Sequence, residues 1–375
     1  MVLIQLWLCL VGCRGQDKPA ESASPVDTWG DSVPWETDWE APACEAVSGA
    51  SALSWTADAG VTAATPDGEV DPNTRVSAIL PLAQPGAVLA VHDGALYRSA
   101  DAGCTWSAEA LPDGQNRSLV AGADGIVWGW SRALHTLLRI NGATLELVSA
   151  PDVTLAGFGA DPSDADRLRA GDTGCDTWQS TDGGQTWSLL YEAPVDTLSA
   201  YAVVFDPDDL DHVICAQTHQ GVWVSADGGD RWDQGRGLTS AGDLNIFDAV
   251  FVPGERDVVW AHGLYPGEGA RDALFRSADG GASWTELLVE GAGLGEGVSI
   301  DADAPLAVHG GAPNVIAFSG GTTLYTYDHR AEALTASAPF AEREIQALAA
   351  IPSAPGAWML GIGYDTIGAR PVRIR

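Results

Sequence analysis

Short apolar runs separated by turn residues cover the chain from about residue 75 onward. Residues 202–205 and 249–252 are examples, and each run ends just before a proline, Pro207 or Pro253. No segment repeats its apolar residues at the three- and four-residue spacing of an amphipathic helix. Short apolar runs bounded by Pro, Gly and Asp are typical of strands. The pattern therefore predicts an all-β chain.

Four segments of the form S-x-D-x-G-x-x-W, called S-x-D turns below, lie between such runs. An aromatic residue stands two positions before each serine, so both side chains lie on one face of a strand. The aspartate can accept hydrogen bonds from turn amides, and the glycine allows positive φ. The tryptophan then buries a large ring against the neighbouring sheet. The segments are Tyr97, Ser99, Asp101, Gly103 and Trp106; Trp178, Ser180, Asp182, Gly184 and Trp187; Trp223, Ser225, Asp227, Gly229 and Trp232; and Phe275, Ser277, Asp279, Gly281 and Trp284.

This repeat resembles the Asp-box, or BNR, family, whose members fold as β-propellers of the sialidase-like type. The resemblance implies that these aspartates are structural staples of turns and not catalysts. It also implies that the loops on the face opposite the turns are those used by enzymes of the family.

The spacing of the repeat gives the number of blades. The four aspartates follow one another at about 81, 45 and 52 residues, so one repeat has decayed near Arg139–Gly142. The prolines that follow apolar runs form a second series. Their spacing is also doubled across the decayed repeat, and it is doubled again between Pro253 and Pro352. Runs at 306–309, 315–318 and 323–328 fill the second of these doubled intervals. Seven units result.

The last unit is incomplete at the carboxyl end. Residues 345–351, 358–364 and 371–375 supply three strands, and we expect the fourth from residues near 52–63. Sharing the last blade between the two ends of the chain closes the ring and hides its sheet edges. The sequence therefore predicts a seven-bladed β-propeller over residues 45–375.

The first 44 residues predict export and a lipid anchor. Residues 2–12 are apolar but shorter than a membrane span, as in a secretory signal. Leu10-Val-Gly-Cys13 resembles a bacterial lipobox, which implies a signal peptide at 1–12 and lipidation of Cys13; a short buried strand is the alternative. Residues 13–44 are acidic and Pro-rich, typical of a disordered tether. We expect a protein of the bacterial cell envelope, outer membrane or periplasmic side; Arg14 favours the outer membrane.

Charge limits the partners. The chain carries 51 acidic against 19 basic residues, a formal net charge of −32. That field repels nucleic acid and anionic membrane surfaces. Contact with a membrane is therefore expected only through the lipid anchor, and we expect a monomer.

Four cysteines remain after the signal and the lipid site: Cys44, Cys104, Cys175 and Cys215. An even number in an exported chain indicates disulfides, with three possible pairings. Cys44 with Cys104 would tie the start of the domain to the first S-x-D turn, which leaves Cys175 with Cys215.

No motif identifies an enzyme. Gly-rich phosphate loops, H-E-x-x-H and G-x-S-x-G are absent from the sequence, so no cofactor is predicted. Ahead of the first S-x-D turn, Arg75-Val-Ser-Ala-Ile-Leu-Pro differs from the arginine motif of sialidases. Two acidic stretches beginning at Asp161 and Asp206 favour polar hairpin turns over calcium sites. His92, His219 and His262 favour turn positions over a metal site, so no metal is expected.

The longest loops on the face opposite the S-x-D turns, 233–245, 262–272 and 290–303, are expected to be neighbours. The candidate contact residues there are Asn245, Tyr265, Glu268, Arg271 and Asp272. The favoured hypothesis is a non-catalytic module that binds a protein or glycan at the cell envelope. The alternative is a carbohydrate-active enzyme, a glycoside hydrolase or sialidase-like protein, that uses the same face. The family also includes photosynthetic assembly factors, but nothing in this sequence points to photosynthesis.

Overall fold

The fold was obtained as a computed structural model. It describes residues 78–92, 94–101, 106–194, 200–238, 244–266, 270–289, 305–320, 323–336, 345–352, 357–362 and 369–373. The chain divides into two units, Met1–Pro34 and Trp35–Arg375. Every described residue belongs to the second unit, and the signal and tether expected at 1–44 lie outside the described residues.

The described strands form six four-stranded sheets and one three-stranded sheet, all antiparallel. Each sheet takes consecutive strands of the chain. The first four sheets are β1 (Ala78–Pro81), β2 (Val88–His92), β3 (Ala95–Ser99) and β4 (Ser107–Ala110); β5 (Ser118–Ala121), β6 (Val127–Trp130), β7 (Thr136–Asn141) and β8 (Thr144–Ser149); β9 (Leu155–Ala160), β10 (Leu168–Asp172), β11 (Thr177–Ser180) and β12 (Ser188–Tyr191); and β13 (Ala200–Asp206), β14 (Asp209–Gln217), β15 (Gly221–Ser225) and β16 (Asp233–Gln234). The others are β17 (Asn245–Val252), β18 (Glu255–Tyr265), β19 (Arg271–Ser277) and β20 (Thr285–Val289); β21 (Leu306–Val308), β22 (Val315–Gly320), β23 (Thr323–Asp328) and β24 (Ala333–Ala336); and β25 (Ile345–Ala350), β26 (Ala357–Ile362) and β27 (Ala369–Arg373).

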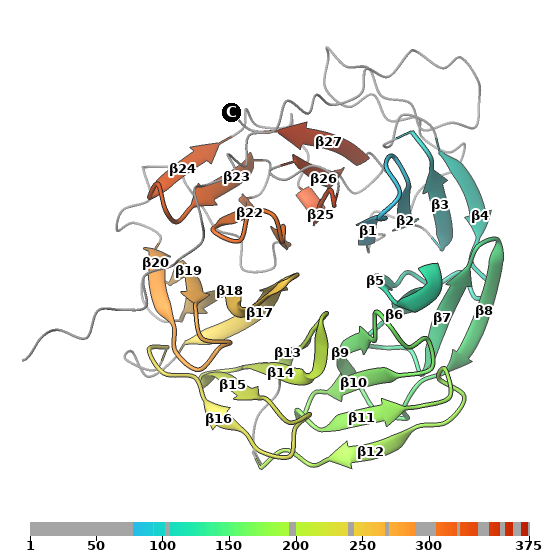
Figure 1. Cartoon of the computed structure of the whole chain (residues 1–375), viewed down its shortest axis with the longest axis horizontal. Coiled ribbons are helices and arrows are strands. Elements are labelled where there is room, and N and C mark those ends of the chain that lie inside the picture. Colours follow the sequence, from blue (N-terminus) through green and yellow to red (C-terminus); the bar gives the residue numbers. More distant parts are fainter. Residues whose placement is uncertain are drawn as a thin grey trace, which may run out of the picture. The chain divides into compact units, whose positions relative to one another are not determined.

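The sheets stand around a common axis as a β-propeller (Figure 1). The first strand of each sheet is innermost and lies beside the first strands of its two neighbours; β25 lies beside both β21 and β1. The described part of the chain has no α-helix and one 3₁₀ segment, η1 (Ala123–Gly125). No described helix has the length and hydrophobicity needed to cross a bilayer.

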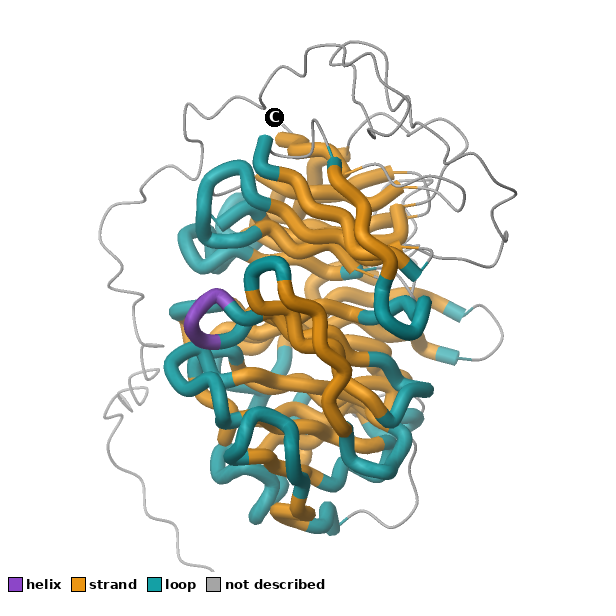
Figure 2. Tube along the Cα trace, turned by 90° about the vertical axis from the view of Figure 1, so that its right-hand side faces the viewer, coloured by secondary structure: helices purple, strands orange, loops and turns teal. Residues whose placement is uncertain are grey.

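Loops and turns lie on two opposite sides of the strands (Figure 2). The S-x-D turns join third to fourth strands and therefore lie on one side, called the turn face. Loops between second and third strands, and those leading into each first strand, lie on the other side, called the mouth face. This division follows from the antiparallel order of each sheet, because successive strands reverse direction.

The S-x-D turns have the hydrogen bonds expected from their residues. In the last one, Ser277 Oγ donates to Asp279 Oδ1 at 2.9 Å and accepts from the Gly281 amide at 2.8 Å. Asp279 Oδ1 also accepts from the Ser283 amide at 2.7 Å. The same bonds occur in the turns of Ser180 and Ser225, and Ser99 donates to Asp101 in the first. Gly103 lies outside the described residues.

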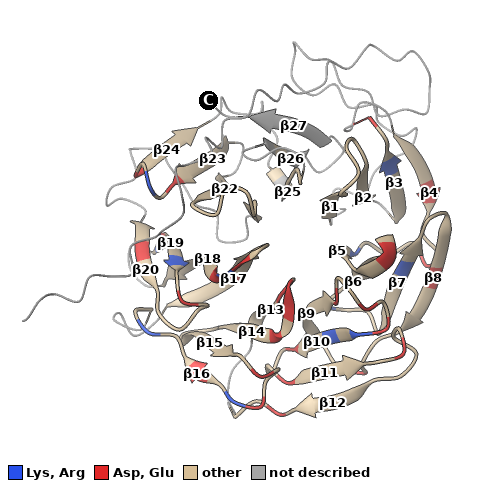
Figure 3. Cartoon of the chain, viewed as in Figure 1, with Lys and Arg blue, Asp and Glu red and all other residues tan. Residues whose placement is uncertain are grey.

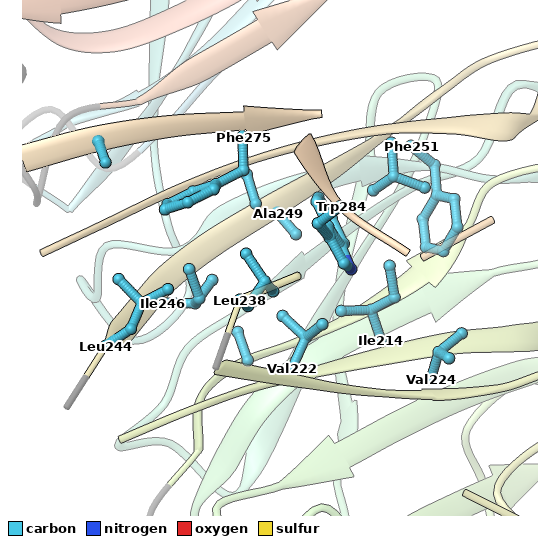
Figure 4. Packing of buried hydrophobic residues seen from close by; sticks show 14 residues of the cluster. Ile214, Val222, Val224, Leu238, Leu244, Ile246, Ala249, Phe251, Phe275 and Trp284 are labelled. Atoms are coloured by element: carbon cyan, nitrogen blue, oxygen red, sulfur yellow. The ribbon is translucent and has the colours of Figure 1, made fainter. Parts of the chain in front are cut away.

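The tryptophan of each turn packs between its own sheet and the preceding sheet. Trp284 lies among Ile214 of β14 and Ala249 and Phe251 of β17 (Figure 4). Trp187 packs in the core between β5–β8 and β9–β12, and its Nε1 donates to the Ser149 carbonyl at 2.9 Å. The other two follow the same rule: Trp232 packs with Cys175, and Trp106 with Ala347.

The strands predicted from the sequence within the described residues are present. The first strands β1, β9, β13, β17 and β25 end at, or one or two residues before, a proline: Pro81, Pro162, Pro207, Pro253 and Pro352 respectively. Strands β21, β22 and β23 occupy the apolar runs without an S-x-D turn. The decayed repeat is the β7–β8 hairpin, in which Asn141 pairs with Thr144 across a two-residue turn. The strand expected near 52–63 lies outside the described residues.

A disulfide joins two neighbouring sheets. Cys175, in the loop after β10, bonds to Cys215 of β14, with their Cα atoms 6.0 Å apart. Both residues are buried. This is one of the pairings that the sequence left open; Cys44 and Cys104 lie outside the described residues.

Replacing Ser277 by alanine tests the hydrogen bonds of the turn. The change leaves the buried Gly281 amide without its acceptor, so we expect the free energy of unfolding to fall by about 1–3 kcal/mol. Chemical denaturation measures it. Ser107→Ala, at an exposed position on β4, is the control and should change stability by less than about 0.5 kcal/mol. Equal effects of the two changes would show that the turn bonds contribute little.

Candidate functional site

A cavity of about 790 Å³ lies at the centre of the ring, and residues from the first strand of every sheet line it. From those strands its wall includes Leu80, Leu119, Val120, Ala121, Ala156–Ala160, Tyr201–Phe205, Phe247, Asp248, Val250, Phe251, Leu306–Val308 and Leu348–Ala350. The wall is largely apolar, because these strands are the short apolar runs that packing around an axis buries. Acidic positions lie mostly at turns and outer strands (Figure 3).

The first strands approach each other closely around the cavity. A Cβ atom on Gly157 of β9 would lie 1.6 Å from the Val203 carbonyl oxygen of β13. Only glycine permits this approach of two backbones. The narrow centre of the ring thus depends on small residues in the first strands.

Three partly buried aromatic residues surround the cavity at the mouth face: Trp130 at the end of β6, and Tyr201 and Phe247 near the starts of β13 and β17. The rings of Tyr201 and Phe247 are 4.5 Å apart between centroids. These residues and Arg132 are called the channel mouth. A second cavity of about 290 Å³ shares Trp130, Arg132 and Tyr201 with the first.

Arg132 is held by backbone and not by a carboxylate. Its guanidinium donates to the Ala200 carbonyl at 2.6 Å and to the Tyr201 carbonyl at 3.2 Å. Ala200 and Tyr201 are the first residues of β13, so Arg132, which follows β6, connects the sheet β5–β8 with the sheet β13–β16. Its exposed charge is placed where a ligand entering the cavity would meet it.

Two ionisable side chains, Asp248 and His262, line the wall of the cavity. They are register partners on β17 and β18. Burial raises the pKa of Asp248 to about 6, opposed by the hydrogen bond that its carboxylate accepts from the Ala249 amide. Burial lowers the pKa of His262 to about 4. At neutral pH the pair is therefore a carboxylate beside a neutral imidazole.

The structure places four of the five predicted contact residues at one edge of the sheet β17–β20. Tyr265 and Arg271 are register partners, and the guanidinium lies 5.6 Å from the centroid of the Tyr265 ring. Tyr265 Oη donates to Glu286, and burial together with that carboxylate raises the pKa of Tyr265 above its usual range. Asp272 is half-buried beside them. Glu268 lies outside the described residues.

Asn245, the fourth of these residues, has a structural contact. It is buried, and its Oδ1 accepts from the His219 amide at 2.8 Å, which ties the loop of one sheet to the start of the next. Asn116 makes the same contact to the Gly94 amide.

The two acidic stretches form turns, whereas His92 and His262, expected at turns, are buried residues of strands β2 and β18. Asp161 accepts from the amides of Ser163 and Asp164 and pairs with Arg167 at 2.9 Å. Asp206 accepts from the Asp208 amide. Among the described residues no three His, Cys, Asp or Glu side chains gather as metal ligands.

Sequence reasoning missed the channel mouth. Tyr201 and Phe247 stand at or beside apolar runs, where the sequence does not distinguish a core residue from one that lines a cavity, and both line the central cavity. One signal was available: Asp248 interrupts the run at 246–252, where an ordinary core strand has no acid.

Two kinds of comparison bear on the chain. No protein-family model matches it. The Dispase autolysis-inducing protein of Streptomyces mobaraensis is 36% identical to it over 340 residues, which cover 86% of this chain and 90% of the relative.

Solved structures share the propeller fold at low identity. YCF48 from Cyanidioschyzon merolae has a TM-score of 0.59 at 12% identity, over 80% of this chain and 95% of its own; a YCF48 structure with D1 peptide bound has 0.57 at 13%, over 82% and 99%. The GH74 xyloglucanase from Xanthomonas campestris has 0.52 at 17%, over 79% of this chain and 52% of its own. The fold thus occurs in a peptide-bound protein and in an enzyme.

Replacing Asp248 by asparagine tests its unfavourable burial. A carboxyl whose pKa is higher in the folded state stabilises the fold below pH 4 relative to higher pH, and that contribution is lost as pH rises through about 6. We expect Asp248→Asn to raise the free energy of unfolding by about 1–3 kcal/mol at pH 8 and to change it little at pH 4. Denaturation at both pH values measures this. The exposed Asp257→Asn is the control, and a loss of stability in Asp248→Asn at pH 8 would contradict the expectation.

Proposed function

The chain belongs to the family of the Dispase autolysis-inducing protein, and on this premise we propose that it is a non-catalytic, protein-binding β-propeller whose partner is a protease. The proposal depends on the 36% identity to that relative, which extends over 90% of the relative's length. Autolysis is self-cleavage, so the relative's name describes an action on a protease. In this proposal the propeller binds the protease and changes which part of the protease chain reaches a protease active site.

The mouth face is the binding surface of this proposal. Aromatic residues supply large contact area at low entropic cost, and they dominate the energetics of protein interfaces. Tyr201, Phe247 and Trp130 are partly exposed around the cavity, and Arg132 adds a fixed positive charge. The edge formed by Tyr265 and Arg271 belongs to the same sheet as Phe247, so the surface extends outward along that sheet.

The glycosidase alternative has less support. Two-carboxylate hydrolysis needs two acids facing one bond. Among the described residues that line the two cavities, Asp248 alone is an acid. The likeness to the xyloglucanase, at 17% identity, concerns the fold.

Three finer structural points belong to the proposal. The four S-x-D turns are Asp-boxes of the BNR type, supported by the serine-to-aspartate hydrogen bond that all four share. The sheet β25–β27 is the seventh blade, supported by its place beside β1 and β21 and completed by residues near 52–63. The chain is exported and anchored to the cell envelope through Cys13.

Mixing the purified domain, residues 45–375, with Dispase tests the function. We expect a complex by surface plasmon resonance and a faster loss of intact protease on gels, with the propeller itself intact. Tyr201→Ala combined with Phe247→Ala should weaken binding at least about tenfold, because anchor residues are removed. Leu189→Ala, at an exposed apolar position on β12, is the matched control. No complex, or glycoside hydrolysis that Asp248→Asn abolishes, would refute the proposal.

Replacing Cys13 by serine tests the anchor. The lipid is attached through the cysteine sulfur, so the variant should move from the membrane to the soluble fraction. Cell fractionation with immunoblotting measures this. Cys9→Ser, within the signal, should leave the protein in the membrane, and unchanged fractionation of Cys13→Ser would disprove the anchor.

A further inference from the structure

The described first strands of the ring carry two acidic side chains, Asp206 and Asp248, and only one of them has a structural role. Asp206, at the end of β13, is 1% exposed; it accepts from the Asp208 amide and lies 3.3 Å from His212 Nδ1. Asp248, three residues into β17, accepts one bond from the amide that follows it in the chain. Asp248 therefore ties no second element to its strand.

His262 faces the same cavity from the next strand. Directly opposite residues of an antiparallel pair project from one face of the sheet, and Asp248 and His262 are such partners. His262 is 1% exposed, and its Nδ1 has no hydrogen-bond partner among the described residues. A buried polar atom left unpaired costs free energy.

The side chains of Asp248 and His262 both need a hydrogen-bond donor. Both carry acceptor atoms, the carboxylate of Asp248 and, in the tautomer protonated on Nε2, the Nδ1 atom of His262. The rest of the wall is mainly aliphatic and aromatic, and the other ionisable residues lining it are Arg132 and Tyr201 at the mouth. Such a wall accommodates a ligand with an apolar stem and a positively charged group that donates hydrogen bonds.

We propose that the central cavity, called the channel below, binds a primary alkylammonium group. The Asp248 carboxylate is its counter-ion, His262 Nδ1 is a second acceptor, and the apolar wall surrounds its alkyl stem. A lysine side chain, a free amino terminus and a small amine share this chemistry. Three N–H donors of an ammonium match the acceptors that the protein leaves unused. An anion would meet the carboxylate, and a neutral ligand would leave the charge of Asp248 uncompensated.

The pKa values are consistent with this site. His262 remains neutral at pH 7 because burial lowers its pKa to about 4, so it accepts and does not repel a cation. Burial raises the pKa of Asp248 to about 6, and a bound ammonium is expected to lower it again. A carboxyl with a strongly shifted pKa beside a cavity is a candidate for ligand binding.

This inference goes beyond the proposed function and does not need the protease. A protease that inserts a lysine would contact the channel mouth and the cavity together, but ammonium binding can be tested on the purified chain without the protease. Failure of Dispase to bind leaves ammonium binding intact, and failure of ammonium to bind leaves the aromatic mouth intact.

The test compares n-butylammonium with n-butanol and butyrate at pH 7.5, by calorimetry and by the NMR shift of the His262 ring. We expect n-butylammonium to bind at least about tenfold more tightly than n-butanol and butyrate not to bind. Binding should also lower the pKa of the Asp248 carboxyl, read from its ¹³C shift. Equal binding of the amine and the alcohol would overturn the proposal without any variant.

Variants and peptides sharpen the test. Asp248→Asn should reduce the preference for the amine to less than about twofold, whereas the exposed Asp257→Asn should retain it. An unchanged preference in Asp248→Asn refutes the site. Two peptides separate the sources of the ammonium group: one contains lysine and has its amino terminus acetylated, and the other has a free amino terminus and no lysine. If n-butylammonium binds and neither peptide does, the site is one for small amines.

Discussion

The tryptophan that ends each S-x-D turn is packed between its own sheet and the preceding one. Removing a buried tryptophan side chain costs about 3–5 kcal/mol, more than the roughly 1 kcal/mol of a single turn hydrogen bond. The Ser–Asp hydrogen bonds therefore matter chiefly because they hold the tryptophan at a fixed angle to its strand. Trp284, set between β14 and β17, shows how one residue fixes the relation of two sheets (Figure 4).

The central cavity follows from this packing. Sheets held side by side around an axis bring their first strands together, and the backbone contact at Gly157 shows how close the approach is. The wall is then built from the most apolar strands of the chain. One carboxylate in such a wall stands out, since burial disfavours its charged form.

Much of the fold could be predicted because its signals are local. Proline at or near the end of five first strands, glycine at a positive φ and aspartate accepting turn amides act within a few residues, so Pro207, Gly281 and Asp279 reveal their roles in the sequence. The site is different. Tyr265 and Arg271 were identified as candidates and lie together, but Tyr201 and Phe247 were not, because hydrophobicity does not distinguish a packed side chain from one that lines a cavity.

The sequence by itself determined the strand–turn units, their repetition and the acidic character of the chain, since each depends on neighbouring residues or on a simple sum of charges. Only the tertiary structure decided which residues from distant units meet at the axis. Trp130, Tyr201 and Phe247 come from three sheets, and the pKa of Asp248 is raised by burial in the folded chain. Burial and proximity across sheets are properties of the closed ring, and no single repeat contains them.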